Sequence, residues 1–110
     1  MYELLLEKAG LTKGEAKVYL TLLKIGETTT GNIIKESGLS GSKIYEILDR
    51  LTKKGLVSFI VKERTKWFKA TTPRKLLEYL DMKTEELNKI KKELTEVIKK
   101  LEKLEKPVKC

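Results

Sequence analysis

The side chains best suited to chemistry in this sequence are hydrogen-bond donors and cations gathered between residues 30 and 66. They are the hydroxyl, amine, guanidinium and carboxylate groups of Thr30, Ser40, Ser42, Lys43, Tyr45, Glu46, Arg50, Lys62, Arg64 and Lys66. Hydroxyls and cations bind phosphate oxygens, and Lys and Glu can also bond to base edges. The set therefore predicts an interaction with nucleic acid.

The composition leaves little scope for catalysis. The chain has no His, and no Ser/Lys or carboxylate pair stands in a recognisable catalytic motif. The single cysteine, Cys110, is the last residue, so no internal disulfide or multi-cysteine metal site can form. We therefore expect no enzyme activity, no cofactor and no metal. Cys110 could link two chains, but an incidental tail residue is favoured.

Residues 29–61 have the layout of a helix-turn-helix followed by a strand. A short helix capped by Thr30 leads to a turn at Gly38-Leu39, and a recognition helix over about 41–54 follows the cap Ser40. On this helix one side is apolar, formed by Ile44, Ile47, Leu48 and Leu51. Such a helix places its N-terminal half in the DNA major groove.

The opposite side of this helix carries the candidate base readers Ser42, Lys43, Tyr45 and Glu46. Lys43 can reach a phosphate or guanine, and Glu46 can accept from a cytosine amino group. The alternative is that these are only solvated positions, or that Tyr45 packs against the domain edge. Acids on this face lower non-specific affinity and so favour selective binding.

A hairpin over about 57–71 is predicted next. Val57, Phe59 and Val61 alternate with Ser58, as in a half-buried strand, and a polar turn leads to a second strand. Residues 62–75 hold six basic residues and one acid. As a wing, the hairpin could reach the DNA backbone or minor groove through Lys62, Arg64 and Lys66. The alternative is a charged hairpin that only faces solvent.

Helices are also predicted on either side of this region. A short helix over 2–8 precedes one that starts with a capping box of Thr12 and Glu15 and ends at Gly26. Its predicted core residues are Ala16, Val18, Tyr19, Leu20 and Leu23.

The C-terminal helix, from Thr72-Pro73 to about Lys106, carries an apolar seam. Its members, mostly spaced by three and four with Lys83 interrupting, are Leu76, Leu80, Leu87, Ile90, Leu94, Val97, Leu101 and Leu104. This spacing is typical of a coiled-coil dimer, parallel or antiparallel. The alternative is that the helix folds back, but at 1.5 Å per residue it spans roughly 50 Å, too long for a small domain to cover.

Charge is divided unevenly along the chain. The net charge is +8; residues 1–75 hold 15 Lys and Arg against 8 acids, whereas residues 76–110 hold 9 against 8. Basic surface attracts phosphate, although a Lys-rich surface can be basic without such a partner. Abundant Lys and Glu and the lack of Gln suggest a thermophile. With no long apolar run and no signal-peptide pattern, a cytoplasmic protein without a membrane partner is expected.

The sequence resembles the N-terminal domain of the TrmB-like archaeal transcriptional regulators. The resemblance spans roughly residues 4–80 and rests on EAKVYLTLL, GLSGSKIY, KKGLV and FKATTP. It implies a winged helix that binds DNA, with contacts at Ser40, Ser42, Lys43 and Tyr45, and a following helix that mediates dimerisation. The chain departs at Gly41, where a basic residue is common, and it stops without the large sugar-sensing domain of long members, so a sugar response is not implied.

Together these features predict a mainly α protein with a small β-hairpin (α+β): a winged helix-turn-helix over residues 1–75 and a long coiled-coil dimerisation helix over 76–110. The expected function is sequence-specific binding of double-stranded DNA as a homodimeric transcriptional regulator. A winged-helix module for protein–protein interaction in a larger complex is the alternative. The operator, the direction of regulation and any small-molecule effector are not readable from these residues.

Overall fold

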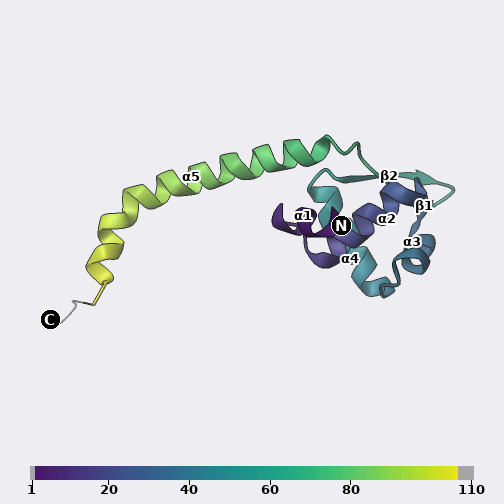
Figure 1. The fold of residues 1–110 in the computed structure, drawn as a ribbon, viewed down its shortest axis with the longest axis horizontal. Helices are drawn as coiled ribbons and strands as arrows, with labels where there is room; N and C mark the ends of the chain where they lie inside the picture. The colour runs from purple at the N-terminus through teal and green to yellow at the C-terminus, as the bar shows by residue number, and fades with distance from the viewer. Residues whose placement is uncertain (1, 107–110) are drawn as a thin grey trace. The chain divides into compact units, whose positions relative to one another are not determined.

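The computed structural model describes residues 2–106, which form five helices and three strands (Figure 1). The helices are α1 (Tyr2–Lys8), α2 (Lys13–Ile25), α3 (Thr30–Ser37), α4 (Gly41–Lys53) and α5 (Lys75–Leu104). The strands are β1 (Thr28–Thr29), β2 (Val57–Lys62) and β3 (Thr65–Ala70). The predicted class, mainly helical with a small β-hairpin and a long last helix, is confirmed.

The chain divides into two compact units, residues 1–79, which we call the head, and residues 80–110. The head takes in the start of α5 because Tyr79 is buried there and Leu76 packs against the same core. Lys75 and Leu76 donate to the carbonyls of Thr72 and Pro73, so a turn precedes the helix. Helix α5 therefore begins at Lys75, later than predicted from Thr72-Pro73.

Helix α2 begins with the predicted capping box. The Glu15 backbone N–H donates to Thr12 Oγ1 at 3.1 Å, and the Thr12 N–H donates to Glu15 Oε1 at 2.8 Å. The buried stripe of this helix runs through Glu15, Val18, Tyr19 and Leu22 at helical spacing. The predicted burial of Leu23 is wrong, because this residue lies at the edge of the stripe and is 42% exposed.

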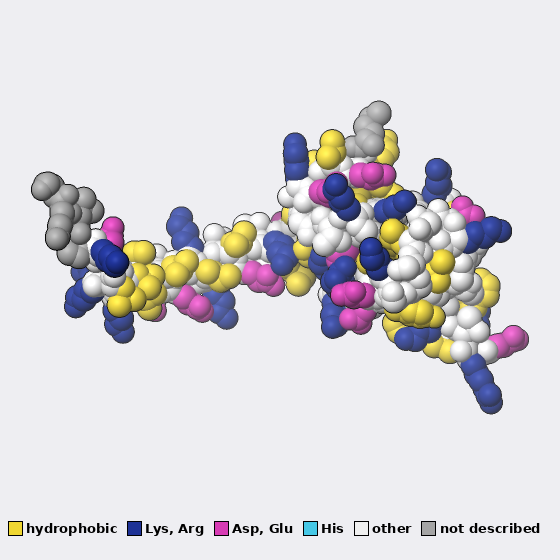
Figure 2. Space-filling model, turned by 90° about the horizontal axis from the view of Figure 1, so that it is seen from below, with side chains coloured by type: hydrophobic (Ala, Val, Ile, Leu, Met, Phe, Trp, Pro, Cys, Tyr) yellow, Lys and Arg dark blue, Asp and Glu magenta, His cyan; other side chains and the backbone are white. Residues whose placement is uncertain are grey.

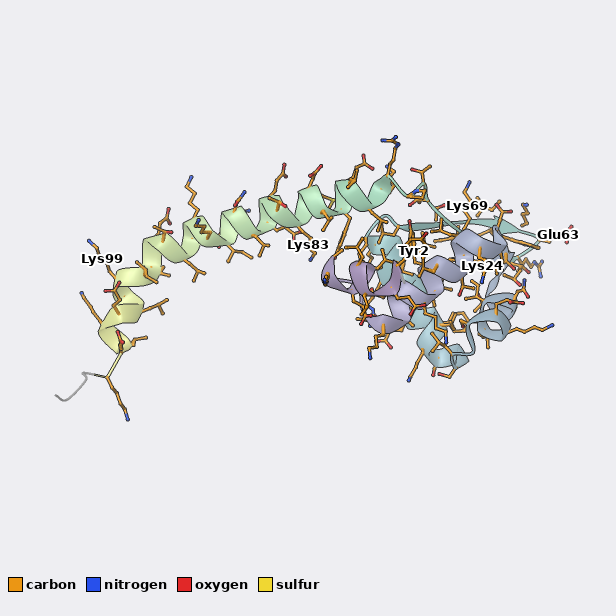
Figure 3. All side chains as sticks on the ribbon, viewed as in Figure 1. Tyr2, Lys24, Glu63, Lys69, Lys83 and Lys99 are labelled. Atoms are coloured by element: carbon orange, nitrogen blue, oxygen red, sulfur yellow. The ribbon has the colours of Figure 1, made fainter. Side chains whose placement is uncertain are left out.

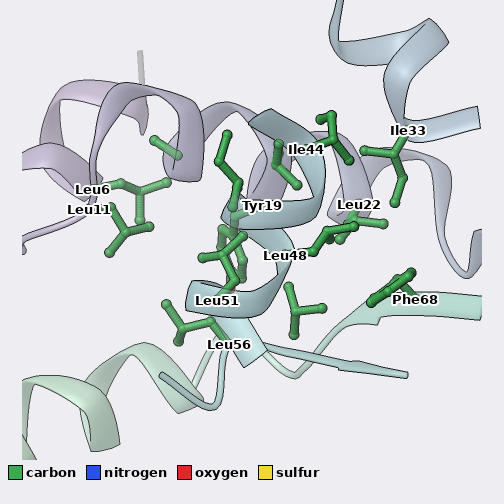
Figure 4. Close-up of a cluster of buried hydrophobic side chains, with 14 of the residues drawn as sticks. Leu6, Leu11, Tyr19, Leu22, Ile33, Ile44, Leu48, Leu51, Leu56 and Phe68 are labelled. Atoms are coloured by element: carbon green, nitrogen blue, oxygen red, sulfur yellow. The ribbon is translucent and has the colours of Figure 1, made fainter. Parts of the chain in front are cut away.

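The apolar side of α4 is buried as predicted, and it forms the centre of the core with α2, α3 and the sheet (Figure 4). Helices α2 and α4 approach closely at Gly14, where a Cβ would come within 2.7 Å of the terminal methyl Cδ1 of Ile47. Helix α3 ends at Ser37, and its C-cap Gly38 has a left-handed φ of 74°. Leu39 then packs against the core. Thr30 is the first residue of α3 and Thr29 its cap, one residue earlier than predicted.

The three strands form an antiparallel sheet in the order β1-β3-β2. Strands β2 and β3 pair from Val57 with Ala70 to Lys62 with Thr65, and β1 joins the other edge of β3. The predicted burial of one side of β2 is confirmed only at the start of the strand. Val57 is buried, but Phe59 and Val61 are 40% and 61% exposed, because the far part of the hairpin has no helix packed over it. Within the described residues, no helix is long and apolar enough to cross a membrane.

Candidate nucleic-acid interface

The N-terminal half of α4 presents its polar side to solvent. Ser42, Lys43, Tyr45 and Glu46 are all exposed, as is the cap residue Ser40, whose hydroxyl lies 3.5 Å from that of Ser42. Tyr45 is 64% exposed, so it is not packed away at the edge of the domain. Because the opposite side of α4 is buried in the core, this exposed side is held in a fixed orientation.

A groove of about 680 Å³ separates α4 from the hairpin. Among the residues that line it are Thr30 and Tyr45 from α3 and α4, and Phe59, Arg64 and Lys66 from the hairpin and its turn. The fold thus brings together four predicted site residues from separate segments. Ser40, Ser42, Lys43 and Glu46 do not line the groove and lie on the exposed side of α4 instead.

Two lysines of the hairpin lie over aromatic rings. Lys66 Nζ is 4.6 Å from the ring centroid of Phe59, and Lys62 Nζ is 5.4 Å from that of Trp67. Such stacking holds an ammonium group over the ring face by cation–π attraction. Lys62 is also paired with Glu27 at 3.1 Å, which partly neutralises its charge. Lys66 is therefore the better placed of the two for an external anion.

The turn of the hairpin has an unusual backbone for its residue types. Glu63 and Arg64 connect the two strands with φ values of 48° and 68°, and Figure 3 shows Glu63 at the end of the hairpin. Two-residue hairpin turns with positive φ normally use Asn and Gly, since a side chain in this region costs about 1 kcal/mol or more. The turn therefore carries an exposed Arg64 in a conformation that glycine would adopt more easily.

Arg50 is engaged in ion pairs within the head. Its Nε lies 3.4 Å from Glu15 Oε2, without the geometry of a hydrogen bond, and its Nη1 donates to Glu46 Oε1 at 3.2 Å. Glu15 is fully buried and also accepts from Lys54 at 2.8 and 2.9 Å. From the sequence, Glu15 is predicted only as a capping residue, because nothing local to it signals pairing with residues so distant in the chain.

Helix α5 beyond the head exposes a band of apolar side chains, which Figure 2 shows as a row flanked by charges. The exposed residues on the predicted seam are Leu80, Leu87, Ile90, Leu94, Val97, Leu101 and Leu104, with exposed fractions between 38% and 80%. Ile98, at 45%, adds to this band and was not predicted. Leu76 differs from the rest of the predicted seam because it packs against the core of the head.

Residues 2–106 contain no group of three or more His, Cys, Asp or Glu that could hold a metal ion. On α4 and the hairpin, the exposed Lys43, Arg64 and Lys66 are donors that match the oxygens of a phosphodiester backbone. Cys110 lies outside the described residues.

Sequence comparisons match this chain to one family model and to individual proteins. The family model described as the sugar-specific transcriptional regulator TrmB matches residues 6–74. The sugar-sensing transcriptional regulator TrmBL1 of Pyrococcus furiosus is 46% identical over 55 residues, which cover 50% of this chain and 16% of that protein. The protein YrhO of Bacillus subtilis is 33% identical over 82 residues, which cover 74% of this chain and 30% of YrhO. This chain therefore spans less than a third of the length of these two relatives.

Solved structures share the architecture. TrmBL2, described as an archaeal chromatin protein with a novel mode of DNA binding, has a TM-score of 0.68 and 29% identity, covering 94% of this chain and 39% of that one. A MepR variant from S. aureus bound to an oligodeoxyribonucleotide has a TM-score of 0.59 and 20% identity, covering 94% and 86%. These likenesses confirm the predicted winged-helix fold.

Proposed function

The chain belongs to the TrmB family of transcriptional regulators, and on that premise we propose that it binds double-stranded DNA in a sequence-specific manner as a homodimer. In this proposal the DNA-binding domain comprises residues 1–75 and the dimerisation helix residues 76–110. Helix α4 enters the major groove, and the hairpin is the wing that contacts the backbone or an adjacent minor groove. The location that we propose for such a regulator is the cytoplasm.

The observation that carries the proposal is the surface shared by α4 and the wing turn. Lys43 is exposed on α4, while Arg64 and Lys66 line the groove beside it. Arg64 occupies a positive-φ position that a glycine would fill at lower energy. Strain of this kind is retained where a side chain is needed for function, and for an arginine beside a recognition helix that function is a phosphate contact.

The homodimer is supported by the seam of α5. Beyond the head, its leucines and isoleucine are 38% to 80% exposed along several turns. Glu86 and Lys91 flank the seam at positions that pair across a parallel dimer. A second copy of the helix would bury this band and place two recognition helices on one DNA duplex. Two half-sites related by symmetry are the matching target.

The alternative is a module that binds another protein. It is favoured by the apolar side chains of β2, since Phe59, Ile60 and Val61 are 40%, 46% and 61% exposed. A partner strand or apolar surface could cover them. The wing carries lysine and arginine beside these residues, which fits a polyanion better than an apolar partner.

A salt-series titration tests the proposal. The duplex is the sequence that the full chain enriches from a random pool, and the comparison is a scrambled duplex of equal length. We expect preference for the selected duplex and a steep loss of affinity with salt, because phosphate contacts release counterions. Replacing Lys43 and Arg64 by Ala should reduce the log–log salt slope by about 2, since each lost phosphate contact reduces it by about 0.9.

The matched control replaces Lys92 and Lys99 by Ala, two exposed lysines on α5 away from the seam. This control removes the same net charge and should leave the slope nearly unchanged. Equal, weak binding of the wild-type protein to both duplexes would support the protein-interaction module instead. An unchanged slope in the Lys43/Arg64 variant would show that DNA contacts a different surface.

A further inference from the structure

The buried carboxylate of Glu15 joins α2 to the C-terminal half of α4. It is fully inaccessible to solvent and accepts from the Thr12 N–H and from the Lys54 ammonium, at 2.8 to 2.9 Å. Arg50, one helical turn before Lys54, places its Nε 3.4 Å from the same carboxylate. An acid buried this completely is retained only with such partners, because taking a charge out of water costs several kcal/mol. The capping box alone does not require two cations.

Arg50 links this buried carboxylate to the exposed side of α4. The guanidinium is planar and rigid, so a position of Nε near Glu15 also sets the position of Nη1. Nη1 donates to Glu46 Oε1 at 3.2 Å. Arg50 is 41% exposed and Glu46 is 69% exposed, so the arginine runs from the buried acid to an acid that can meet DNA.

We propose that Glu15 is a positioning residue for base reading: through Arg50 it fixes the Glu46 carboxylate on the recognition helix. This inference rests on the proposed function, in which Glu46 accepts from a cytosine amino group. A carboxylate that is already fixed loses no further side-chain entropy when it accepts a hydrogen bond from the correct base. At the same position it repels a phosphate or the acceptor edge of a wrong base. Glu15 then governs discrimination between sequences, whereas the wing lysine and arginine govern affinity.

The test compares E15Q, R50M and E46A with the wild-type full chain on the selected and scrambled duplexes. Each of the three should lower the ratio of the two affinities by on the order of tenfold, the typical effect of one lost base contact. The salt slope should not change, because none of these side chains contacts a phosphate in this proposal. E15Q added to E46A should lower the ratio no further, since both changes act on the same carboxylate.

Two controls separate positioning from a loss of folding. R50M keeps the pair of Glu15 with Lys54, so it remains folded even if E15Q is destabilised, and it must show the same loss of discrimination. E78Q removes an exposed acid that pairs with Lys75 at 3.0 Å on α5, and it should match the wild type on both duplexes.

Each other outcome overturns the inference in a recognisable way. A wild-type protein without sequence preference refutes the proposed function, and this inference with it. Discrimination that is kept in E15Q and R50M but lost in E46A refutes only the role of Glu15. A salt slope reduced by about 1 in R50M makes Arg50 a phosphate contact instead. Equal weakening on both duplexes, additive with E46A, assigns Glu15 a purely structural role.

Discussion

At the scale of single residues, the clearest energetic feature is the ionisation of Glu15. Burial alone would raise the pKa of its carboxyl, but hydrogen bonds from Lys54 and the Thr12 backbone, together with the charges of Lys54 and Arg50, outweigh burial and hold the pKa below its ordinary value of 4.5. An acid whose pKa is lower in the folded state stabilises the fold above its unfolded-state pKa. That contribution is lost as the pH falls through the folded-state pKa.

We therefore predict an acid-dependent stability difference between the wild-type protein and E15Q. The wild type should be the more stable above the ordinary carboxyl pKa of 4.5, and the difference should shrink as the pH falls through the lowered pKa of Glu15. Urea unfolding followed by circular dichroism at a series of pH values measures it. A difference that stays constant over this range would mean that the Glu15 charge does not contribute to folding.

At the scale of elements, the side chains of the wing turn lower the stability of the fold and, in the proposed function, strengthen DNA binding. Glu63 and Arg64 adopt positive φ values in a two-residue turn, where glycine removes the steric cost of a side chain. The sheet accepts this cost at its exposed end, where the hairpin has little packing to lose. An element shaped for folding alone would carry Asn-Gly at this position.

Arg64→Gly should therefore change stability and DNA binding in opposite directions. We expect the free energy of unfolding to rise by about 1 kcal/mol, while affinity falls and the salt slope decreases by about 0.9 as one phosphate contact is lost. The matched control is Glu63→Gly, which relieves the neighbouring position and keeps the arginine. It should stabilise the protein without weakening DNA binding. Loss of stability in both variants would contradict strain in the turn.

At the scale of the whole molecule, charge and apolar surface are assigned to different parts. Residues 1–75 carry a net charge of +7 and residues 76–110 a net charge of +1. The exposed leucines and isoleucines instead concentrate on α5 beyond the head. In the proposed dimer, a nearly neutral helix avoids repulsion between its two copies, while the positive charge remains available for DNA.

Leu94→Lys combined with Leu101→Lys should convert the dimer to a monomer, because four lysines would meet in the seam of the assembled pair. Sedimentation velocity should show monomer mass, and affinity for a duplex with two half-sites should fall much more than affinity for one half-site. Asn88→Lys, which adds a charge to α5 outside the seam, should remain dimeric. A double variant that keeps dimer mass would exclude this seam as the interface.

The sequence by itself determined the elements and much of their orientation. Capping residues, left-handed glycines and the three-four spacing of apolar residues act within a few positions of one another, so they specify helices α1 to α5 and the buried side of α4. The same local logic placed the hairpin and its basic residues. It failed at β1, whose two residues are too few to show alternation and which exists only by pairing with β3.

Only the tertiary structure decided what those elements bury and which charges meet. Phe59 and Val61 alternate like buried residues, yet they are exposed because no helix covers that part of the sheet. Arg50, whose role as a DNA contact stays a prediction, is paired with Glu15 in the fold, and Lys54 reaches the same acid across 39 positions of the chain. Burial and ion pairing depend on which surfaces come into contact. A pattern of neighbouring residues in the sequence does not show which surface will pack against them.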